Sequence, residues 1–301
     1  MLANLNDVLV PAKKEKYGVG LFNAVNLELA RGIIEAAEEL KSPVIIGTAE
    51  ILLPYGPLKN IADLIVPMAR EASVPVVIHY DHGLTFDKCI EALKYGFTSI
   101  MYDCSTDSYE ENVKKVAEMV KIAHAYGATV EGELGHVGDN EGEGRLDDPT
   151  AYYTDPEVAK DYVERTGVDA LAIAVGNAHG AYKFPPKLDF ERIATIADLI
   201  NVPLVLHGGS GLSEADFQRA IEEGICKVNI FTDIDVAAAN GAKKAFEEGA
   251  GSLIGMIPYE VEAVKEVVKN KMKLFCSVNR STPMYEEYDF SDAVRNPYIK
   301  C

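Results

Sequence analysis

The sequence contains no run of about eighteen apolar residues, the length that a membrane-spanning helix needs. Its first residues, Met1-Leu-Ala-Asn-Leu-Asn-Asp7, also lack the basic segment and apolar stretch of a secretory signal. The five cysteines are scattered, with no CxxC pair, which favours free thiols over a disulfide framework. We therefore expect a cytoplasmic protein with no membrane partner.

Positive charge is scarce. The chain has 29 lysines and arginines against 47 aspartates and glutamates, which gives a net charge of −18. A nucleic-acid partner requires a basic face to neutralise the phosphate backbone, so we expect none. A local cationic site for a small anion is still compatible with this balance.

Eight short apolar runs alternate with longer amphipathic stretches along the 301 residues. Near-continuous Val, Ile and Leu is typical of strands that are buried on both faces. This alternation predicts an α/β fold, the (β/α)8 or TIM barrel, with a doubly wound open sheet as the alternative. The eight candidate strands lie near residues 17–23, 43–49, 75–81, 99–104, 128–133, 169–175, 202–207 and 226–231.

Helical periodicity is clear at residues 27–40 and 109–125, and again from Val261 to Phe275. Residues 134–154 are rich in glycine and acidic side chains and have neither period, which is typical of a functional lid or of disorder. We see no internal repeat and no linker. We therefore expect residues 1–301 to form a single barrel domain with a C-terminal helical extension from about residue 258.

Polar side chains gather where the predicted strands end, and barrel enzymes carry their active sites at that end. Each of these residues also has a structural alternative: Asp103 could cap the following helix, and Glu131 and Glu133 could support opposite faces of a strand. His79 is equally compatible with a place in the core and with a place behind the site residues. The polar strand-end residues are Asn23, Asp81, His82, Asp103, Glu131, Glu133, Asn177, His179, His207 and Asn229.

Three of these residues, His82, His179 and His207, each follow an apolar run. Three neutral imidazoles leave one zinc position open, which is the arrangement of a catalytic rather than a structural site. The Asp81 carboxylate precedes His82 and could move a proton beside the metal. The sequence therefore predicts a catalytic zinc centre, although a strand-end histidine can also be a packed residue.

The glycine-rich segment Gly208-Gly209-Ser210-Gly211 follows a strand and precedes the helix that Ser213 opens. Backbone N–H groups in such a turn can converge on an anion. In barrels, phosphate sites favour the loops after strands seven and eight, which here are this loop and the one near Thr232. We expect a phosphate site there, with a simple tight turn as the alternative.

Together these motifs resemble the class II, metal-dependent ketose-bisphosphate aldolases. The resemblance runs from Phe22-Asn23 to Arg280. Its most specific segments are His79-Tyr-Asp81-His82-Gly83, Glu131-Gly-Glu133-Leu-Gly135, Asn177-Ala-His179-Gly-Ala-Tyr-Lys183, His207-Gly-Gly-Ser-Gly211 and Lys227-Val-Asn229.

The resemblance implies roles for individual residues. His82, His179 and His207 would bind one catalytic Zn²⁺, with Glu133 as an alternative ligand and Asp103 near a second metal position. Asp81 would act as acid and base on the hydroxyl beside the cleaved bond, and Glu141 would exchange the proton of the enediolate. A second divalent or a monovalent cation is a further expectation. The candidate substrate contacts are Asn23, Gly180, Lys183, Gly208, Ser210, Asn229, Thr232 and Arg280.

Four residues depart from the fructose-bisphosphate pattern. Phe231 replaces an aspartate near the C4 hydroxyl, Asp235 replaces an arginine for the distal phosphate, and Ala49 replaces a serine. In the lid, Asp139 replaces a glycine. The first three concern the far end of the substrate, so the identity of the aldehyde stays open. An aspartate beside a phosphate would repel it.

The predicted function is reversible cleavage of a ketose 1-phosphate or 1,6-bisphosphate into dihydroxyacetone phosphate and an aldehyde. A metal-dependent hydrolase on the same barrel is one alternative. A non-catalytic subunit that binds sugar phosphates or stabilises a partner is another. The resemblance also implies a homodimer or homotetramer, with Arg280 reaching towards a neighbouring subunit.

Overall fold

The computed structural model describes residues 1–135, 137, 152–178 and 187–281. Eight parallel strands follow one another in sequence order, and the pairing of β4 with β5 closes them into a barrel. The structure therefore confirms the predicted (β/α)8 barrel and excludes the alternative, an open sheet. The barrel strands are β2 (Val19–Asn23), β3 (Val44–Ala49), β4 (Val76–Gly83), β5 (Ser99–Tyr102), β6 (Thr129–Leu134), β7 (Ala170–Ile173), β8 (Leu204–Leu206) and β9 (Ile225–Ile230).

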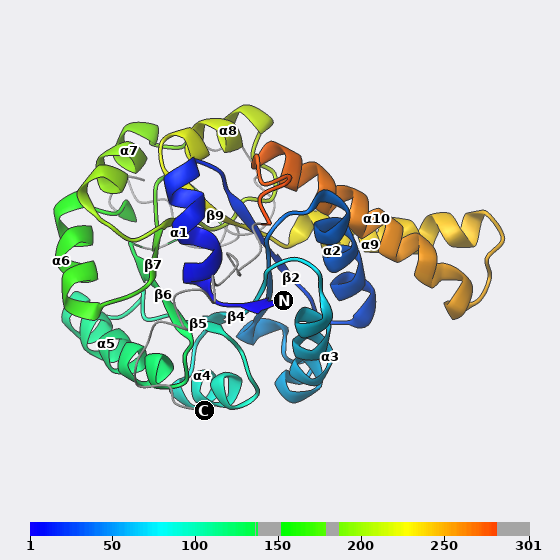
Figure 1. Cartoon of the computed structure of the whole chain (residues 1–301), viewed down its shortest axis with the longest axis horizontal. Coiled ribbons are helices and arrows are strands. Elements are labelled where there is room, and N and C mark those ends of the chain that lie inside the picture. The colour runs from blue at the N-terminus through cyan, green and yellow to red at the C-terminus, as the bar shows by residue number, and fades with distance from the viewer. Residues whose placement is uncertain (136, 138–151, 179–186, 282–301) are drawn as a thin grey trace, which may run out of the picture.

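Helices surround this barrel and cover its outer face (Figure 1). Local signals fix their starts: the Asn26 side chain accepts a hydrogen bond from the Leu29 N–H, 3.0 Å away, and so caps the second helix. The surrounding helices are α2 (Leu27–Leu40), α3 (Leu58–Glu71), α4 (Phe86–Lys94), α5 (Tyr109–Ala125), α6 (Pro156–Thr166), α7 (Phe190–Leu199), α8 (Glu214–Glu222) and α9 (Thr232–Glu247).

The N-terminal end of the barrel is closed by two elements that sequence reasoning missed, β1 (Leu2–Ala3) and α1 (Leu5–Glu15). β1 pairs in parallel with the start of β4. The Leu5 N–H donates to the Thr129 hydroxyl at the start of β6, and the Lys13 ammonium donates to two carbonyls before β8. This end is therefore plugged, and only the opposite end can hold a site.

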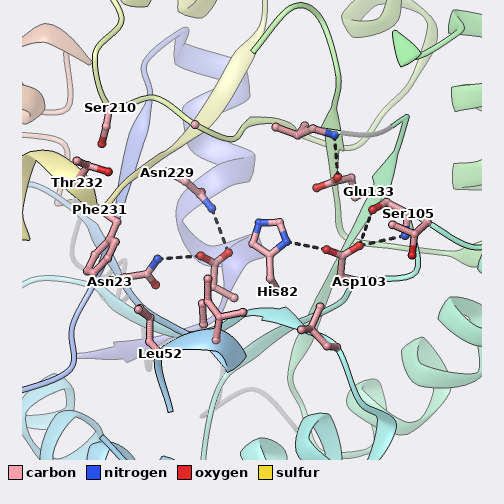
Figure 2. Close-up of a pocket in the computed structure, with 17 residues that line it drawn as sticks. Asn23, Leu52, His82, Asp103, Ser105, Glu133, Ser210, Asn229, Phe231 and Thr232 are labelled. Carbon is pink, nitrogen blue, oxygen red and sulfur yellow. Dashed lines mark hydrogen bonds and ion pairs between the residues drawn. The ribbon is translucent and has the colours of Figure 1, made fainter. Parts of the chain in front are cut away.

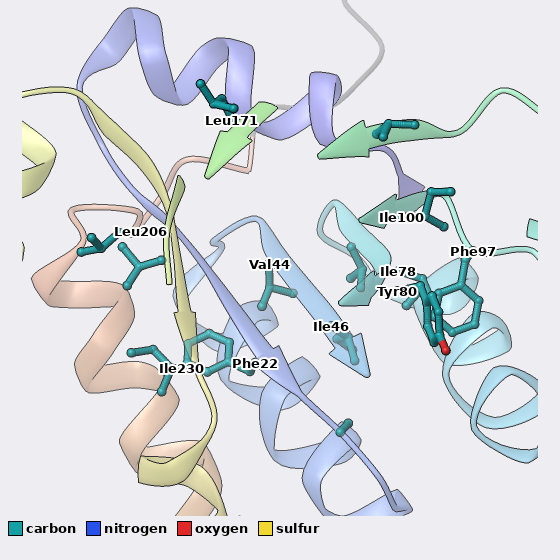
Figure 3. Close-up of a cluster of buried hydrophobic side chains, with 14 of the residues drawn as sticks. Phe22, Val44, Ile46, Ile78, Tyr80, Phe97, Ile100, Leu171, Leu206 and Ile230 are labelled. Carbon is teal, nitrogen blue, oxygen red and sulfur yellow. The ribbon is translucent and has the colours of Figure 1, made fainter. Parts of the chain in front are cut away.

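Side chains alternate along each strand between the barrel interior and the helix layer. On β4, Ile78 and Tyr80 pack outwards against the helices, in the layer that Figure 3 shows. Val77 faces inwards and belongs to the apolar cluster that α1 closes. His79 and Asp81 share the inward parity of Val77 and lie progressively nearer the C-terminal end. The interior thus changes from apolar to polar towards that end.

α10 (Leu253–Leu274) begins several residues before the predicted start of the C-terminal extension. It packs along α9 and α2, and the α9–α10 pair extends beyond the barrel wall (Figure 1). The Ser252 side chain caps α10 by accepting from the Gly255 N–H. Among the described residues, no helix combines the length and apolar character needed to cross a bilayer.

A bulge at the end of β4 decides where two site residues point. Tyr80 pairs with Ile100 and Gly83 with Tyr102, so Asp81 and His82 together face a single residue of β5. His82 has a left-handed backbone with φ of 44°, which is strained for a residue with a side chain. Consecutive strand residues normally point to opposite faces, and the bulge lets both of these reach one pocket.

We predict that Gly83→Ala destabilises the protein by about 1–3 kcal/mol, the usual cost of overpacking. A Cβ at this position would lie 2.5 Å from the Cys89 sulfur and 2.8 Å from the Met101 carbonyl oxygen. Gly251→Ala is the matched control, because a Cβ there meets nothing within 4 Å. Unfolding midpoints of the two variants and the parent test this, and an unchanged midpoint for Gly83→Ala would contradict it.

Candidate active site and metal centre

A pocket of about 540 Å³ opens at the C-terminal end of the barrel (Figure 2). It is lined by side chains from strands that lie far apart in the sequence. The structure therefore brings many of the predicted site residues together. These are Asn23, Asp81, His82, Asp103, Glu133, Gly208, Ser210, Asn229 and Thr232.

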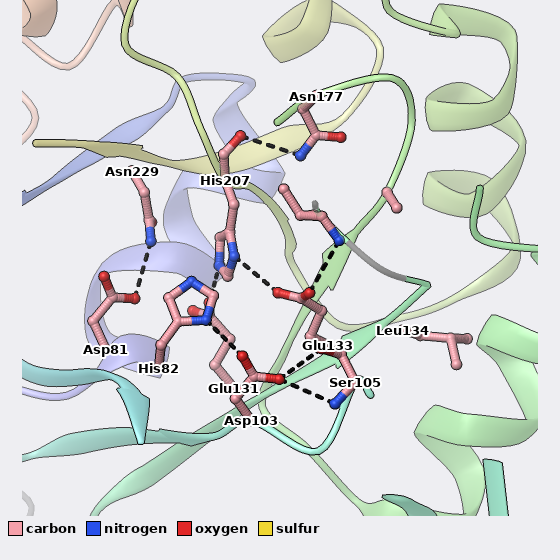
Figure 4. Close-up of polar contacts among 12 residues, drawn as sticks. Asp81, His82, Asp103, Ser105, Glu131, Glu133, Leu134, Asn177, His207 and Asn229 are labelled. Atoms are coloured by element: carbon pink, nitrogen blue, oxygen red, sulfur yellow. Dashed lines mark hydrogen bonds and ion pairs between the residues drawn. The ribbon is translucent and has the colours of Figure 1, made fainter. Parts of the chain in front are cut away.

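Two imidazoles lie against each other at the base of this pocket, with the rings of His82 and His207 4.6 Å apart between centroids. His82 Nδ1 is 2.8 Å from an Asp103 carboxylate oxygen, and His207 Nε2 is 2.8 Å from Glu131 Oε1 (Figure 4). A carboxylate on one ring nitrogen fixes the orientation of the ring and directs the other nitrogen away from it, as in metal sites.

The chemistry of the donor set fits a divalent cation. Donor atoms of Asp81, His82 and His207 all lie within 4.8 Å of one another, and so do those of His82, Asp103 and Glu133. Bonds of about 2.0–2.2 Å from one ion to nitrogen and oxygen ligands are compatible with this spacing. The two sets share His82, so they describe adjoining positions in one centre rather than two remote sites.

The charges of the centre are set by burial and by close neighbours. Burial by itself lowers the pKa of His207, but the adjacent Glu131 and Glu133 carboxylates outweigh it and raise this pKa to about 10. Burial by itself raises the pKa of Asp81, but His82 and Lys227 outweigh it and hold this pKa at about 2. Asp81 is therefore ionised and can accept a proton.

The Asp81 carboxylate is held by two side-chain amides. Asn23 Nδ2 donates to one of its oxygens at 2.9 Å, and Asn229 Nδ2 donates to the other at 3.1 Å. The amides come from β2 and β9, on the side of the pocket away from Asp103 (Figure 2). This cradle fixes the direction of the carboxylate beside the His82 ring.

A layer of buried polar groups lies below the pocket. His79 is fully buried, with Nδ1 2.7 Å from the Ser99 hydroxyl and Nε2 about 4 Å from Asp81 and Glu131. Burial lowers the pKa of His79 to about 4, so its ring is neutral. His79 supports the site from beneath and does not line the pocket.

The loop after β8 and the start of α9, where the sequence predicts a phosphate site, both line the pocket. A Cβ on Gly209 would lie 2.7 Å from Val228 and 2.9 Å from the Asn229 carbonyl oxygen, so only glycine allows this close passage. The Ser210 hydroxyl is buried and has no hydrogen-bond partner among the described residues. No side chain caps the N-terminus of α9, where Thr232 lies. The Ile234 and Asp235 N–H groups donate to the Phe231 carbonyl oxygen, so only the N–H groups before them could meet an anion.

Sequence reasoning missed several lining residues. Ser105 donates from its N–H and its hydroxyl to Asp103 Oδ1, at 3.0 and 2.7 Å. The Asp-x-Ser spacing is typical of a turn of this kind and could have indicated it. The other missed residues have no such signal, because they come from different loops of the chain. They are the apolar residues Ile51, Leu52, Leu84 and Val137 and the polar residue Thr106.

Two candidates lie away from the pocket. Arg280 pairs with Glu15 at the end of α1 and stacks on Tyr17, with its guanidinium carbon 5.2 Å from the ring centroid. Both neighbours belong to the plugged end of the barrel, so Arg280 does not reach the pocket of its own chain. Asp235 is exposed on α9 and does not line the pocket, whereas Ala49 and Phe231 do.

Four predicted site residues lie outside the residues that the structure describes. They are the third predicted zinc ligand His179, the lid residue Glu141 and the two substrate contacts Gly180 and Lys183. Asp139 also lies outside them. Their assigned roles stay predictions.

Fold and site together define a barrel whose metal-type donor set shares one pocket with the glycine-rich loop after β8. Comparisons with known proteins agree with this class. The family model for class II fructose-bisphosphate aldolases matches residues 3–280. A fructose-bisphosphate aldolase from Thermus caldophilus is 40% identical, over 93% of this chain and 100% of that protein. A probable fructose-bisphosphate aldolase from Bacillus subtilis is also 40% identical, over 93% and 99%.

Solved structures lead to the same family. The crystal structure of the YdjI aldolase from Escherichia coli K12 superposes with a TM-score of 0.85 at 38% identity, covering 94% of this chain and 100% of that one. The chain belongs to the class II fructose-bisphosphate aldolase family. It is therefore a metal-dependent aldolase, an aldehyde-lyase.

Proposed function

We propose that the pocket reversibly cleaves a ketose phosphate into dihydroxyacetone phosphate and an aldehyde. The observation that carries this proposal is the position of Asp81. An ionised carboxylate, cradled by two amides, lies beside the candidate metal ligands and in the same pocket as the anion loop. Neither a metal-dependent hydrolase nor a non-catalytic subunit accounts as well for this arrangement within an aldolase family.

The metal centre in this proposal consists of His82, His179 and His207, with Glu133 as an alternative ligand and Asp103 near a second position. The mixed imidazole and carboxylate donors suit zinc. A bound divalent cation would polarise the substrate carbonyl and stabilise the negative charge that develops during C–C cleavage. Asp103 and Glu131 hold the two described rings in place from behind.

Asp81 is proposed to take the proton from the hydroxyl next to the cleaved bond and to return it during synthesis. Its low pKa keeps it deprotonated at neutral pH, ready for the cleavage direction. Glu141 is proposed to carry the proton at the carbon of dihydroxyacetone phosphate that becomes nucleophilic. These two carboxylates would then serve opposite sides of the broken bond.

The proximal phosphate is proposed to lie against Gly208, Ser210 and Thr232, with Gly180 and Lys183 completing the site. Ser210 supplies a buried hydroxyl, and α9 supplies an uncapped N-terminus. Asn23 and Asn229 are proposed to contact the hydroxyl groups of the sugar in addition to holding Asp81. Assembly as a homodimer or homotetramer, with Arg280 serving a neighbouring subunit, is also proposed.

The far end of the pocket has a different character. Ala49, Ile51 and Leu52 come from the end of β3 and the short 3₁₀ helix η1 (Glu50–Leu52), and Leu84 comes from the loop after β4. Glu50 ties these segments together by accepting hydrogen bonds from the N–H groups of Leu84 and Thr85. These residues form an apolar wall, and Phe231, which directly precedes Thr232, adds a further apolar side chain to the pocket.

No lysine or arginine is among the described residues that line the pocket. A phosphate at the far end of the substrate would therefore meet Phe231, Leu84 and their neighbours, and would lose its hydration without a compensating charge. We propose that the preferred acceptor is an aldehyde with no distal phosphate. This proposal concerns which aldehyde the enzyme accepts, and the proposed aldol chemistry does not depend on it.

We predict that His82→Ala and His207→Ala each lose the bound metal, because each removes a ligand. Asp103→Asn should weaken metal binding by only about 10–100-fold, the usual effect of losing the group behind a ligand. His124→Ala is the control, since His124 lies on α5, is exposed and pairs with Asp169. Metal content after dialysis and chelator competition measure this, and full occupancy in either ligand variant would count against the centre.

Asp81→Ala should lower kcat for aldol cleavage by about 10²–10⁴-fold, the usual contribution of an acid–base group. Metal content should stay near that of the parent, because Asp81 is proposed as a proton carrier. The spacing of the donor atoms would also allow Asp81 to be a metal ligand. Loss of metal in Asp81→Ala would contradict the prediction and indicate that Asp81 is a ligand. Parental turnover would show that Asp81 takes no part in the mechanism.

For the acceptor, we predict that kcat/KM for fructose and tagatose 1-phosphates equals or exceeds that for the corresponding 1,6-bisphosphates. The apolar wall provides no charge for the second phosphate. Coupled detection of dihydroxyacetone phosphate with all four sugars measures the ratio. A bisphosphate preference of a hundredfold, about 2.7 kcal/mol of transition-state binding, would show that the chain holds a distal phosphate after all.

A further inference from the structure

Lys227 is buried inside the barrel, which is unusual for a lysine. It lies on β9, between the metal centre and the apolar bottom of the barrel, and its side chain has no exposed surface. Of the lysines and arginines in the described part of the chain, it alone is buried. The metal-dependent cleavage proposed above requires no lysine nucleophile, so it assigns no such role to Lys227.

The ammonium group of Lys227 has three close contacts. It is 2.8 Å from Glu131 Oε2, 3.1 Å from Glu131 Oε1 and 2.7 Å from Asn229 Oδ1. The contacts with Glu131 Oε1 and Asn229 Oδ1 are hydrogen bonds, and the contact with Glu131 Oε2 is an ion pair. The charge is thus fixed in one place by two partners.

Each of the two partners of Lys227 also holds a residue of the proposed site. Glu131 Oε1 also accepts from His207 Nε2 at 2.8 Å, and Asn229 Nδ2 donates to Asp81 Oδ1 at 3.1 Å. Figure 4 shows His207 and Asn229 converging on the Asp81–His82 corner of the pocket from neighbouring strands. One cation is therefore two contacts away from a proposed metal ligand and from the proposed proton carrier.

Lys227 also determines which way the Asn229 amide faces. An ammonium group only donates, so it must meet the carbonyl oxygen of the amide. The NH₂ group of Asn229 is then directed at Asp81, where it can donate to the carboxylate. If the amide were reversed, its oxygen would face Asp81 and repel it.

We propose that Lys227 is a positioning residue for aldol cleavage, which aims Asp81 through Asn229 and steadies His207 through Glu131. This inference rests on the proposed function of the pocket. Lys227 has no exposed surface and its ammonium group is held by Glu131 and Asn229, so it is not placed to contact the substrate directly. Its effect must pass through its two partners.

The competing explanation is that Lys227 only neutralises Glu131. Lys227→Met alone cannot separate the two, because it leaves a buried carboxylate without its cation, which strongly destabilises a protein. The double variant Lys227→Met/Glu131→Gln removes both charges together. Its glutamine oxygen can still accept from His207, while Asn229 loses the donor that orients it.

Under the proposal, the double variant folds and retains one equivalent of zinc, and chelator competition shows an affinity lowered by no more than the roughly 10–100-fold expected when the carboxylate behind His207 is replaced. Its kcat for cleavage falls by about 10²-fold, the order expected when a reacting group is misplaced by about 1 Å, with little change in KM. Exchange of the dihydroxyacetone phosphate proton with solvent changes much less, since Asp81 is not proposed to serve that step. A purely charge-neutralising role predicts parental kcat.

Two further variants complete the test. Lys13→Met is the matched control, because Lys13 is a partly buried lysine at the plugged end of the barrel, and its kcat should equal that of the parent. If the methionine variant does not fold, Lys227→Arg/Glu131→Asp keeps both charges and nearly the same total length but moves the donors. It should lower kcat by about tenfold or more.

Parental kcat in either folded double variant would overturn the role of Lys227. The same assay separates this from the proposed function. Absence of cleavage by the metal-loaded parent would sink the proposed reaction. Cleavage by the parent together with undiminished cleavage by a double variant would sink only the positioning role.

Discussion

Surplus negative charge buried at one end of the barrel is the constraint on which the site depends. Asp81, Glu131 and Glu133 are each at most 2% exposed, and the only buried lysine of the described chain, Lys227, pairs with Glu131. Carboxylates cannot stay ionised in such a place without hydrogen bonds and opposing charge. Two amides serve Asp81, Lys227 serves Glu131, and the imidazoles or a divalent cation between them balance the remainder.

The plugged end of the barrel makes this concentration of charge possible. α1 seals the interior with Leu5, Leu9 and neighbouring apolar residues, and the inward side chains at the starts of the strands continue that apolar cluster. Buried polar groups such as His79, Glu131 and Lys227 then lie between this apolar cluster and the pocket, which opens at the strand ends. The β4 bulge adds one residue to this end and places Asp81 and His82 side by side. The strain at His82 is compatible with the fold because β4 is paired with β3 on one side and with β5 on the other.

Much of the fold and the location of the pocket could be predicted from the sequence, because apolar runs alternate regularly with amphipathic stretches. Strands buried on both faces have a strong apolar signal, so all eight barrel strands were located to within a few residues. Polar residues at the ends of most of these strands then indicated where the site lies. Contacts across the interior have no local signal. Nothing in the residues around Lys227 predicts that it meets Glu131, and Ile51 and Leu84 come together only because Glu50 joins their loops.

The two ends of the pocket therefore differ in how freely evolution can change them. At the metal end, each functional group is held by a partner that also holds another group, as Lys227 holds both Glu131 and Asn229. Replacing one member leaves a buried charge or an unpaired amide, so change there is costly. At the proposed acceptor end, Ile51 and Leu84 are about half exposed or more and line the pocket from loops. A change in such a residue would alter the shape of the pocket and leave the buried charge balance intact. The proposed aldol chemistry and the proposed choice of aldehyde therefore depend on separate parts of this chain.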